Sequence, residues 1–214
     1  MPSVTVSQQH ITEHALHLFL RHGFKSVTVD DIARESGISK KTLYEQFPDK
    51  DAIIKVCIHC HEQKLDKLHE HFCGVSENAV HEIILVMKTM QEMLSAMNAN
   101  CVSDLQRYYP EAFLEFRKHM NGQKNLILAN LKRGVKEGLY RKDIDIEFTA
   151  WLRMEQIVFL IQHPTVTKQF DFVKAQLESI KLFLYSISTI EGHQLIEKYI
   201  NQIKRKKQVN TIYE

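Results

Sequence analysis

The sequence predicts an all-α protein with an N-terminal three-helix head and a larger helical body after it. Three observations predict this class. Glycine and proline are scarce, with 7 and 4 copies among 214 residues, and they separate long stretches that lack turn signals. Apolar residues in those stretches recur at intervals of three and four, which is the period of an amphipathic helix. Residues 28–47 carry the start and stop signals of two short helices.

Thr28, Gly37 and Ser39 delimit the two short helices of residues 28–47. The Thr28 hydroxyl can cap the first helix, and Asp31, three residues later, completes a capping box. Gly37 stands where a helix C-terminus requires a left-handed residue. Ser39 is a good N-cap for the second helix, which must end before Pro48. The pattern therefore predicts two helices joined by a tight turn.

A helix upstream, from about Ser7 to Gly23, completes a three-helix unit. Its apolar residues Ile11, Ala15 and Phe19 fall on one face, where they can pack against the other two helices. Three short helices with a tight turn before the last are typical of a helix-turn-helix that binds DNA, whose final helix lies in the major groove. The residues at the start of that helix are short, polar or cationic, so we expect them to face bases and phosphates.

From Gln9 to Ile54 the sequence resembles the tetracycline-repressor (TetR) family of bacterial transcription regulators. The matching positions are Ala15, Phe19, Gly23, Phe24, Thr28, Ile32, Ala33, Gly37, Ile38, Ser39, Thr42, Leu43, Tyr44, Phe47 and Lys50. The resemblance implies DNA contacts from Thr28, Lys40, Thr42, Tyr44 and Lys50. We add Ser39 and Lys41 to the predicted contacts, because they also lie at the exposed start of the second helix. It implies that Thr28, Tyr44 and Lys50 bind mainly phosphates. Lys40 and Lys41 stand where many relatives carry a residue followed by glycine or alanine, so the operator sequence is not predicted.

We expect two domains: a DNA-binding domain over residues 7–67, and a helical effector-binding and dimerisation domain over residues 68–214. Beyond the head, periodicity predicts helices over about 49–73, 76–97, 101–107, 110–137, 146–162, 166–189 and 192–205. The stretches from Tyr109 to Glu111 and from Gly134 to Asp143 resemble the points where body helices end and begin in many family members. The resemblance implies a dimeric repressor that a small-molecule effector releases from a palindromic operator.

Two apolar stripes in the body predict a dimer interface. One repeats at intervals of four and three along the helix expected over 166–189, and the other lies in the segment from Phe148 to Ile161. The interface residues that we predict are Phe148, Leu152, Phe159, Val173, Leu177, Ile180, Leu184 and Ile187. The alternative is that both stripes belong to the core of one chain. A dimer is favoured because one recognition helix covers few base pairs, whereas a two-fold pair reads two half-sites.

Methionines and aromatic residues of the body are candidates for the lining of an effector pocket. Methionine is flexible and polarisable, so it suits adaptable apolar cavities as well as ordinary cores. The candidates are Met87, Met90, Met97, Phe113, Phe116, Met120, Trp151 and Met154. Together they predict a mostly apolar small molecule whose identity the sequence does not reveal.

Residues 57–73, CIHCHEQKLDKLHEHFC, are rich in cysteine and histidine. On a helix Cys57, Cys60 and His61 share one face, and His69 with Cys73 form a second pair at i, i+4. Thiolates and imidazoles at such spacing can hold zinc or copper. The two groups lie about 18 Å apart at a rise of ~1.5 Å per residue, so they cannot share one ion.

The leading interpretation assigns neither a metal nor a cofactor. A metal- or thiol-responsive regulator that uses Cys57, Cys60 and His61 is the alternative, and a third element such as Cys101 would have to complete either pair of ligands. A module whose helix-turn-helix binds a protein is a further competitor. The sequence has no phosphate-binding glycine loop, HExxH motif or nucleophile elbow, so we expect no enzymatic activity.

Composition limits the kinds of partner and the cellular location that we expect for the chain. Lysine and arginine number 28 against 26 acidic residues, a net charge of +2, so DNA affinity must come from a local patch and from geometry. Four cysteines without a signal peptide indicate reduced thiols. No uninterrupted apolar run reaches the roughly 18 residues of a membrane span. We therefore expect a cytoplasmic, nucleoid-associated bacterial protein whose partners are double-stranded operator DNA, a second copy of itself and a small-molecule effector.

Overall fold

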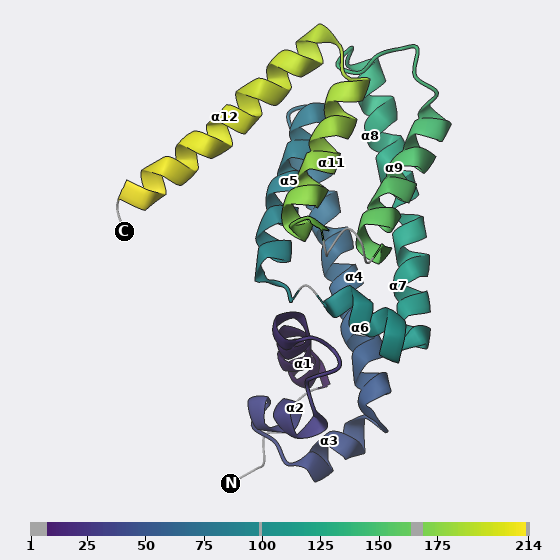
Figure 1. The fold of residues 1–214 in the computed structure, drawn as a ribbon, viewed down its shortest axis with the longest axis vertical. Helices are drawn as coiled ribbons and strands as arrows, with labels where there is room; N and C mark the ends of the chain where they lie inside the picture. The colour runs from purple at the N-terminus through teal and green to yellow at the C-terminus, as the bar shows by residue number, and fades with distance from the viewer. Residues whose placement is uncertain (1–7, 99, 164–168, 213–214) are drawn as a thin grey trace. The chain divides into compact units, whose positions relative to one another are not determined.

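The computed structural model describes residues 8–98, 100–163 and 169–212, and within these ranges it is helical and contains no strand. The helices are α1 (Gln8–His22), α2 (Val29–Glu35), α3 (Lys40–Gln46), α4 (Lys50–Val75), α5 (Ala79–Ala96), α6 (Cys101–Tyr108), α7 (Pro110–Gly122), α8 (Lys124–Lys136), α9 (Ile146–Gln162), α11 (Phe172–Ile187) and α12 (Ile190–Ile212) (Figure 1). The predicted all-α class is confirmed. Among the described residues, no helix combines the length and apolar character needed to span a bilayer.

The chain forms two compact units. The first comprises Met1–Leu68 and Leu94–Asn121, and the second comprises His69–Met93 and Gly122–Glu214. The first boundary lies beside the predicted one at residue 67. The predicted division did not assign 94–121 to the head, however, and these residues belong there because α6 packs against α1.

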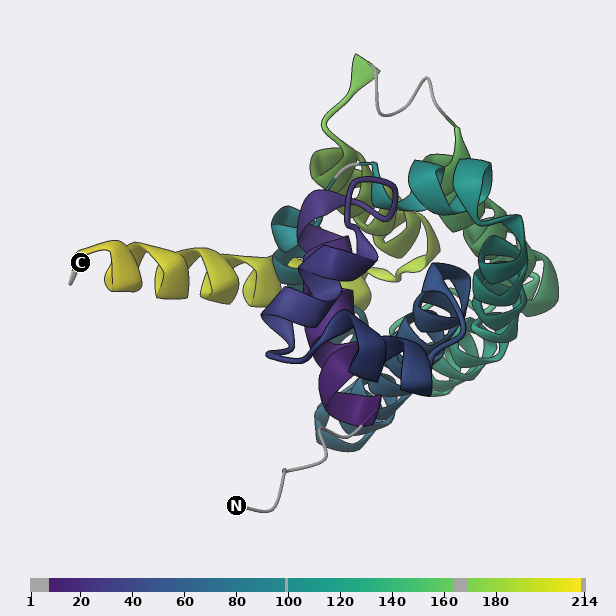
Figure 2. The ribbon, with the colours of Figure 1, turned by 90° about the horizontal axis from the view of Figure 1, so that it is seen from below.

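The core of the first unit joins α1, α2 and α3 to the start of α4 and to α6. Phe19, Leu43 and Phe47 are almost fully buried in it, and Cys101 and Leu105 of α6 complete it. Figures 1 and 2 both show α1, α2 and α3 gathered together, with α2 between the other two along the chain. The apolar faces expected from the sequence therefore hold the three short helices in place.

Local signals set the ends of α2 and α3 as the sequence predicts. The Thr28 hydroxyl accepts a hydrogen bond from the Asp31 amide at 3.2 Å, and the Asp31 carboxylate accepts from the Thr28 amide at 2.9 Å. Gly37 has φ +67°, the left-handed conformation expected after α2. The Ser39 hydroxyl accepts from the Thr42 amide at 3.0 Å. The predicted capping box, turn glycine and second cap are confirmed.

Tyr140 lies in the core of the second unit, to which α5, α8, α9, α11 and α12 contribute buried residues. Its ring is fully buried and its hydroxyl donates to Asn130 Oδ1 at 3.0 Å. The backbone next to Tyr140 is hydrogen-bonded to the end of α11, since the Arg141 amide donates to the Ile187 carbonyl at 2.8 Å. Gly134 allows this packing, because a Cβ there would lie 2.0 Å from Tyr140 Cδ2.

Three predicted helix limits need correction. The helix expected over 110–137 is two helices, since α7 ends at Gly122 and α8 begins at Lys124, where the chain passes from the first unit to the second. The helix expected over 166–189 begins at Phe172, because the Asp171 carboxylate caps it by accepting from the Lys174 amide at 2.7 Å. Residues 166–168 of that prediction lie outside the described residues. The last helix continues to Ile212 and not 205.

Candidate nucleic-acid interface

The start of α3 presents polar side chains to solvent. Ser39, Lys40, Lys41 and Tyr44 are exposed, and Thr42 is half-buried. The Ser39 hydroxyl serves the cap and lies 2.9 Å from the Thr42 hydroxyl, so both side chains have fixed positions. This face matches the geometry of a recognition helix, in which residues near the N-terminus reach base edges.

Lys40 links α3 to α2 through an exposed ion pair. Its Nζ lies 2.9 Å from Asp30 Oδ1, and the hydrogen bond to Asp30 raises the pKa of the Lys40 ammonium. Exposed pairs of this kind contribute little to stability, because water and salt screen them. The ammonium is therefore available for exchange from Asp30 to a phosphate or a base edge.

Thr28 holds the start of α2. Its hydroxyl donates to Asp31 Oδ2 at 2.6 Å in addition to accepting from the Asp31 amide. The side-chain hydrogen bond from Thr28 is the largest cause that lowers the pKa of Asp31, and Arg34, 2.5 Å from Asp31 Oδ1, adds to it. Thr28 remains exposed. To contact a phosphate, the Thr28 hydroxyl must donate to the phosphate the proton that it now donates to Asp31 Oδ2.

The structure gives Lys50 a role that the sequence did not predict. Its Nζ donates to the Phe24 carbonyl at 2.6 Å and lies 5.3 Å from the centre of the Tyr109 ring. Burial lowers the pKa of the Lys50 ammonium, against the opposing effect of Asp104 and Asp51. Lys50 therefore ties the start of α4 to the loop between α1 and α2. A phosphate contact from Lys50 stays a prediction, and it requires the ammonium to turn from Phe24.

Residues of α6 hold the same loop, and sequence analysis missed them. Asp104 Oδ2 accepts from the Lys25 amide at 3.0 Å, and the Lys25 ammonium lies 4.7 Å from the centre of the Tyr108 ring. The Cys101 thiol donates to the Phe19 carbonyl at 3.3 Å. These contacts join segments about 80 residues apart in sequence, so no local pattern could have indicated them. Lys25 is exposed and adds a cation to the head.

The eight candidate pocket residues divide between the two units. Met97, Phe113 and Phe116 pack against the first core, and Met120 lies in the same unit. The second unit holds the rest: Met87, Met90, Trp151 and Met154. Met87 and Met154 are buried, whereas Trp151 is exposed. As core residues, Met87 and Met154 fit the alternative use of methionine in packing.

The predicted interface residues also divide, by exposure. Phe148, Leu152 and Phe159 of α9 are exposed, and Val173 and Leu177 of α11 are half-buried. The last three predicted residues lie in the core of the second unit, at most 3% exposed: Ile180, Leu184 and Ile187. They must be removed from the predicted interface, because their own chain already covers them.

Cys57, Cys60 and His61 do not converge into a ligand cluster within the described part of the chain. The Cys57 thiol is buried and donates to the Thr12 carbonyl at 3.5 Å, and burial raises its pKa well above the ordinary range. Burial also lowers the pKa of His61. A thiol that is closed off from solvent and bonded to a backbone carbonyl is poorly placed to bind a metal ion. The described residues bring together a different trio, His69, Cys73 and Glu82.

Comparisons with known proteins agree with this geometry. The family described as bacterial regulatory proteins, tetR family, matches residues 11–57. Over 49 residues the chain is 45% identical to the putative mycofactocin biosynthesis transcriptional regulator MftR of Mycobacterium tuberculosis, a match that covers 23% of this chain and 25% of that protein. Over 144 residues it is 25% identical to the transcriptional repressor AcnR of Corynebacterium glutamicum, covering 67% of this chain and 73% of the repressor.

Solved structures share the fold. A TetR-family regulator from Agrobacterium tumefaciens superposes with a TM-score of 0.69 at 16% identity, covering 85% of this chain and 97% of that one. The regulator FadR of Bacillus subtilis, solved in complex with stearoyl-CoA, gives a TM-score of 0.61 at 17% identity, covering 83% and 97%. At these identities the likeness concerns the fold alone.

The head, the fold and the named relatives lead to one conclusion. The match over residues 11–57 contains the two capped helices and the exposed start of α3. The longer matches are to proteins named as transcriptional regulators and repressors. Residues 11–57 match the tetR family of bacterial regulatory proteins, and the relatives named as transcriptional repressors support a TetR-family transcriptional regulator.

Proposed function

We propose that the protein is a homodimeric repressor that binds a palindromic operator through α3 and leaves it when a small-molecule effector binds. The observation that carries the proposal is the two-sided character of α3. Leu43 and the following Phe47 are buried in the head, whereas Lys40, Lys41 and Tyr44 are exposed. The apolar side fixes the helix, and the polar cationic side suits phosphates and base edges.

The short length of α3 favours a second copy of the chain. The helix has seven residues and is therefore about 10 Å long, which covers only a few base pairs. A two-fold dimer would place two such helices in successive major grooves, about 34 Å apart. Such an operator is palindromic because the protein pair is symmetric.

An exposed apolar stripe on α9 supports the dimer. Phe148, Trp151, Leu152 and Phe159 are each between 42% and 55% exposed and follow one another at helical spacing. On α11, which packs beside α9, Leu182 is 72% exposed. Large apolar side chains exposed in this number on neighbouring helices suit an interaction site. We propose that α9 and α11 of two chains form a four-helix interface.

The effector in this proposal is a mostly apolar small molecule. Its support is the stearoyl-CoA bound to the similarly folded FadR and the supply of methionine and aromatic side chains in this chain. Because α4 is continuous and contributes residues to both units, a ligand that favours a tilted α4 would change the spacing of the two heads. A 100-fold loss of operator affinity needs a differential affinity of about 2.7 kcal/mol between the two states.

Selection of bound duplexes from a random library tests the proposal. We expect enrichment of a palindrome whose half-sites are about one helical turn apart. The Lys40→Ala variant should enrich a different or weaker consensus, whereas Lys88→Ala, which removes an exposed lysine of α5, should return the wild-type consensus. No enrichment above bulk DNA would overturn specific recognition and favour a helix-turn-helix that binds protein.

We also propose a cytoplasmic location on the nucleoid, since chromosomal DNA is the partner. Fluorescence microscopy of a tagged chain should show it over the DNA, and a uniform distribution would contradict the proposal.

A further inference from the structure

We infer that His69, Cys73 and Glu82 form a binding site for a thiophilic divalent cation of the zinc class. The three side chains come from two successive helices, because His69 and Cys73 lie in the last turns of α4 and Glu82 lies in the first turn of α5. Their candidate ligand atoms all lie within 4.8 Å of one another. The site is local to the corner between the two helices, and it does not depend on the proposed function.

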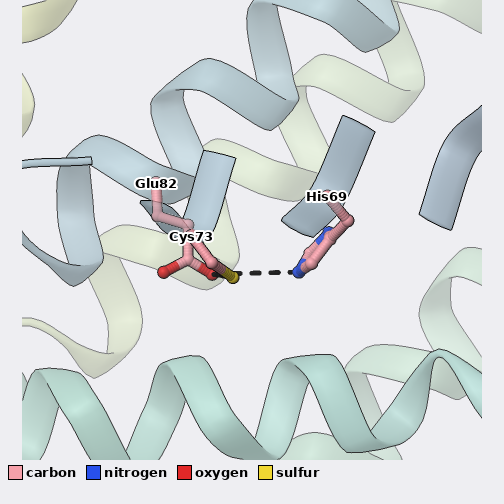
Figure 3. A group of neighbouring side chains, drawn as sticks. All are labelled: His69, Cys73 and Glu82. Carbon is pink, nitrogen blue, oxygen red and sulfur yellow. Dashed lines mark hydrogen bonds and ion pairs between the residues drawn. The ribbon is translucent and has the colours of Figure 1, made fainter. Parts of the chain in front are cut away.

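The orientation of the side chains carries the proposal. His69 and Cys73 are separated by one helical turn and so project from the same face of α4. Figure 3 shows the imidazole, the sulfur and the carboxylate pointing toward one another. Cys73 Sγ lies 3.6 Å from Glu82 Oε1, and His69 Nε2 lies 3.8 Å from the same oxygen.

These separations are close to those of a tetrahedral zinc site. Bonds of about 2.3 Å to sulfur and 2.0 Å to nitrogen or oxygen place neighbouring ligand atoms about 3.3 to 3.6 Å apart. The sulfur–oxygen separation of 3.6 Å lies within this range, the nitrogen–oxygen separation of 3.8 Å lies just above it, and all three ligand atoms lie within 4.8 Å of one another. Rotation of the His69 and Cys73 side chains toward Glu82 would bring the three atoms to bonding distance of one ion.

A second group of residues orients the carboxylate. Arg133 lies 3.2 Å from Glu82 Oε2 and donates to the Ser76 hydroxyl at 2.7 Å and to the Glu137 carboxylate at 2.7 Å. The arginine thus engages one carboxylate oxygen of Glu82, and the other, Oε1, faces His69 and Cys73. Carboxylates that bind metals are typically held in this way by hydrogen bonds from outside the ligand set.

The donor set selects the class of ion. One thiolate, one imidazole and one carboxylate suit zinc and its analogues cobalt and cadmium, whereas magnesium and calcium require mostly oxygen ligands. Glu82 is 2% exposed, but Cys73 is exposed, so an ion can enter from solvent and retain water as its fourth ligand. Binding must release the thiol proton, since burial and Glu82 raise the pKa of Cys73 in the ion-free protein.

The same contacts without an ion form a hydrogen-bonded cluster, in which the Cys73 thiol donates to Glu82. A Co²⁺ titration distinguishes a metal site from a hydrogen-bonded cluster. It uses the full chain without a polyhistidine tag, from which a chelator has first removed any bound metal. We expect one ion per chain, with the visible absorption of tetrahedral cobalt, a thiolate-to-metal charge-transfer band, and displacement by Zn²⁺. Absence of both bands at saturating Co²⁺ would overturn the site.

Three variants assign the ligands. Cys73→Ser should abolish the charge-transfer band, and His69→Gln should lower affinity by 10-fold or more. Cys60→Ser removes a half-buried thiol of the same helix and should leave the titration unchanged. Far-UV circular dichroism shows that each variant is folded. A band that survives in Cys73→Ser but disappears in Cys60→Ser would place the ion elsewhere on α4 and overturn the proposal.

Discussion

Packing around Tyr140 depends on one missing methyl group. Tyr140 is fully buried against α8, and Gly134 of that helix leaves the space that its ring occupies. Gly74, in α4, has no atom within 4 Å of the position a Cβ would take. The two helical glycines therefore offer a matched comparison between a crowded site and an open one.

Gly134→Ala should lower the free energy of unfolding by about 1–3 kcal/mol, because the added Cβ would force the Tyr140 ring or the helix to move. Gly74→Ala should leave it unchanged or raise it by up to about 1 kcal/mol, since alanine is the better helix former. Urea titrations followed by circular dichroism measure both. Equal effects of the two substitutions would show that the Tyr140 contact is not tight.

His61 should make stability depend on pH near neutrality. Burial is the largest cause that lowers its pKa below the ordinary 6.5, with Lys64 and His119 adding to it. The unfolded chain then binds a proton before the folded chain does. The unfolding free energy should therefore fall as pH drops through about 6.5 and toward the folded pKa.

Urea midpoints of wild type and His61→Gln, measured between about pH 7.5 and 6, test this dependence. The variant should show a shallower slope than the wild type. The range stays above about pH 6 because burial raises the pKa of Glu62, which contributes a slope of opposite sign at lower pH. Parallel slopes for the two proteins would remove His61 as the cause.

At the scale of helices, the sequence predicted what local chemistry determines. Thr28, Gly37 and Ser39 act on backbone groups within four residues, so their positions alone indicated the ends of α2 and α3. Lys50 and Asp104 were beyond prediction, because each bonds to the loop between α1 and α2 from a distant part of the chain. The same limit applied to Glu82, which joins His69 and Cys73 from another helix.

The exposed lysines of α3 should determine how salt affects DNA binding. Each phosphate contact contributes about −0.9 to the slope of log affinity against log salt. In a dimer, Lys41→Ala should therefore reduce the slope by about two, and Lys40→Ala should also change sequence preference. Lys88→Ala, an equal charge change on α5, serves as the control and should not alter the slope. Fluorescence anisotropy at several salt concentrations measures it.

An unchanged slope in both α3 variants would mean that phosphates are bound elsewhere on the head. Lys25 would then be the next residue to substitute, since it is exposed beside the same loop.

At the scale of the whole molecule, apolar stripes alone did not reveal which helix surface is left exposed. Ile180, Leu184 and Ile187 have the regular spacing expected of a dimer seam, but they face the core of their own chain. The spacing of apolar residues predicts which side of a helix is buried. It does not predict whether that side packs against the same chain or against a second chain. The exposed stripe on α9 is a different surface. The burial of each side chain in the folded chain distinguishes it from the buried stripe on α11.

Leu152→Glu should convert the dimer to a monomer, because it places a charge within the α9 stripe that we propose to be buried between chains. Leu114→Glu is the matched control, since Leu114 is a similarly exposed leucine on α7. Analytical ultracentrifugation should show the wild type and Leu114→Glu as dimers and Leu152→Glu as a monomer. Dimers in all three would move the interface away from this stripe.

The most direct test of the account is a titration of the selected operator by the wild-type protein, with the intact palindrome compared to a duplex in which one half-site is scrambled. We expect two chains per intact duplex and a loss of at least about 100-fold in affinity for the scrambled one, because each lost base contact costs roughly 1–3 kcal/mol. Binding of a single chain, with equal affinity for both duplexes, would contradict a dimeric operator-binding regulator.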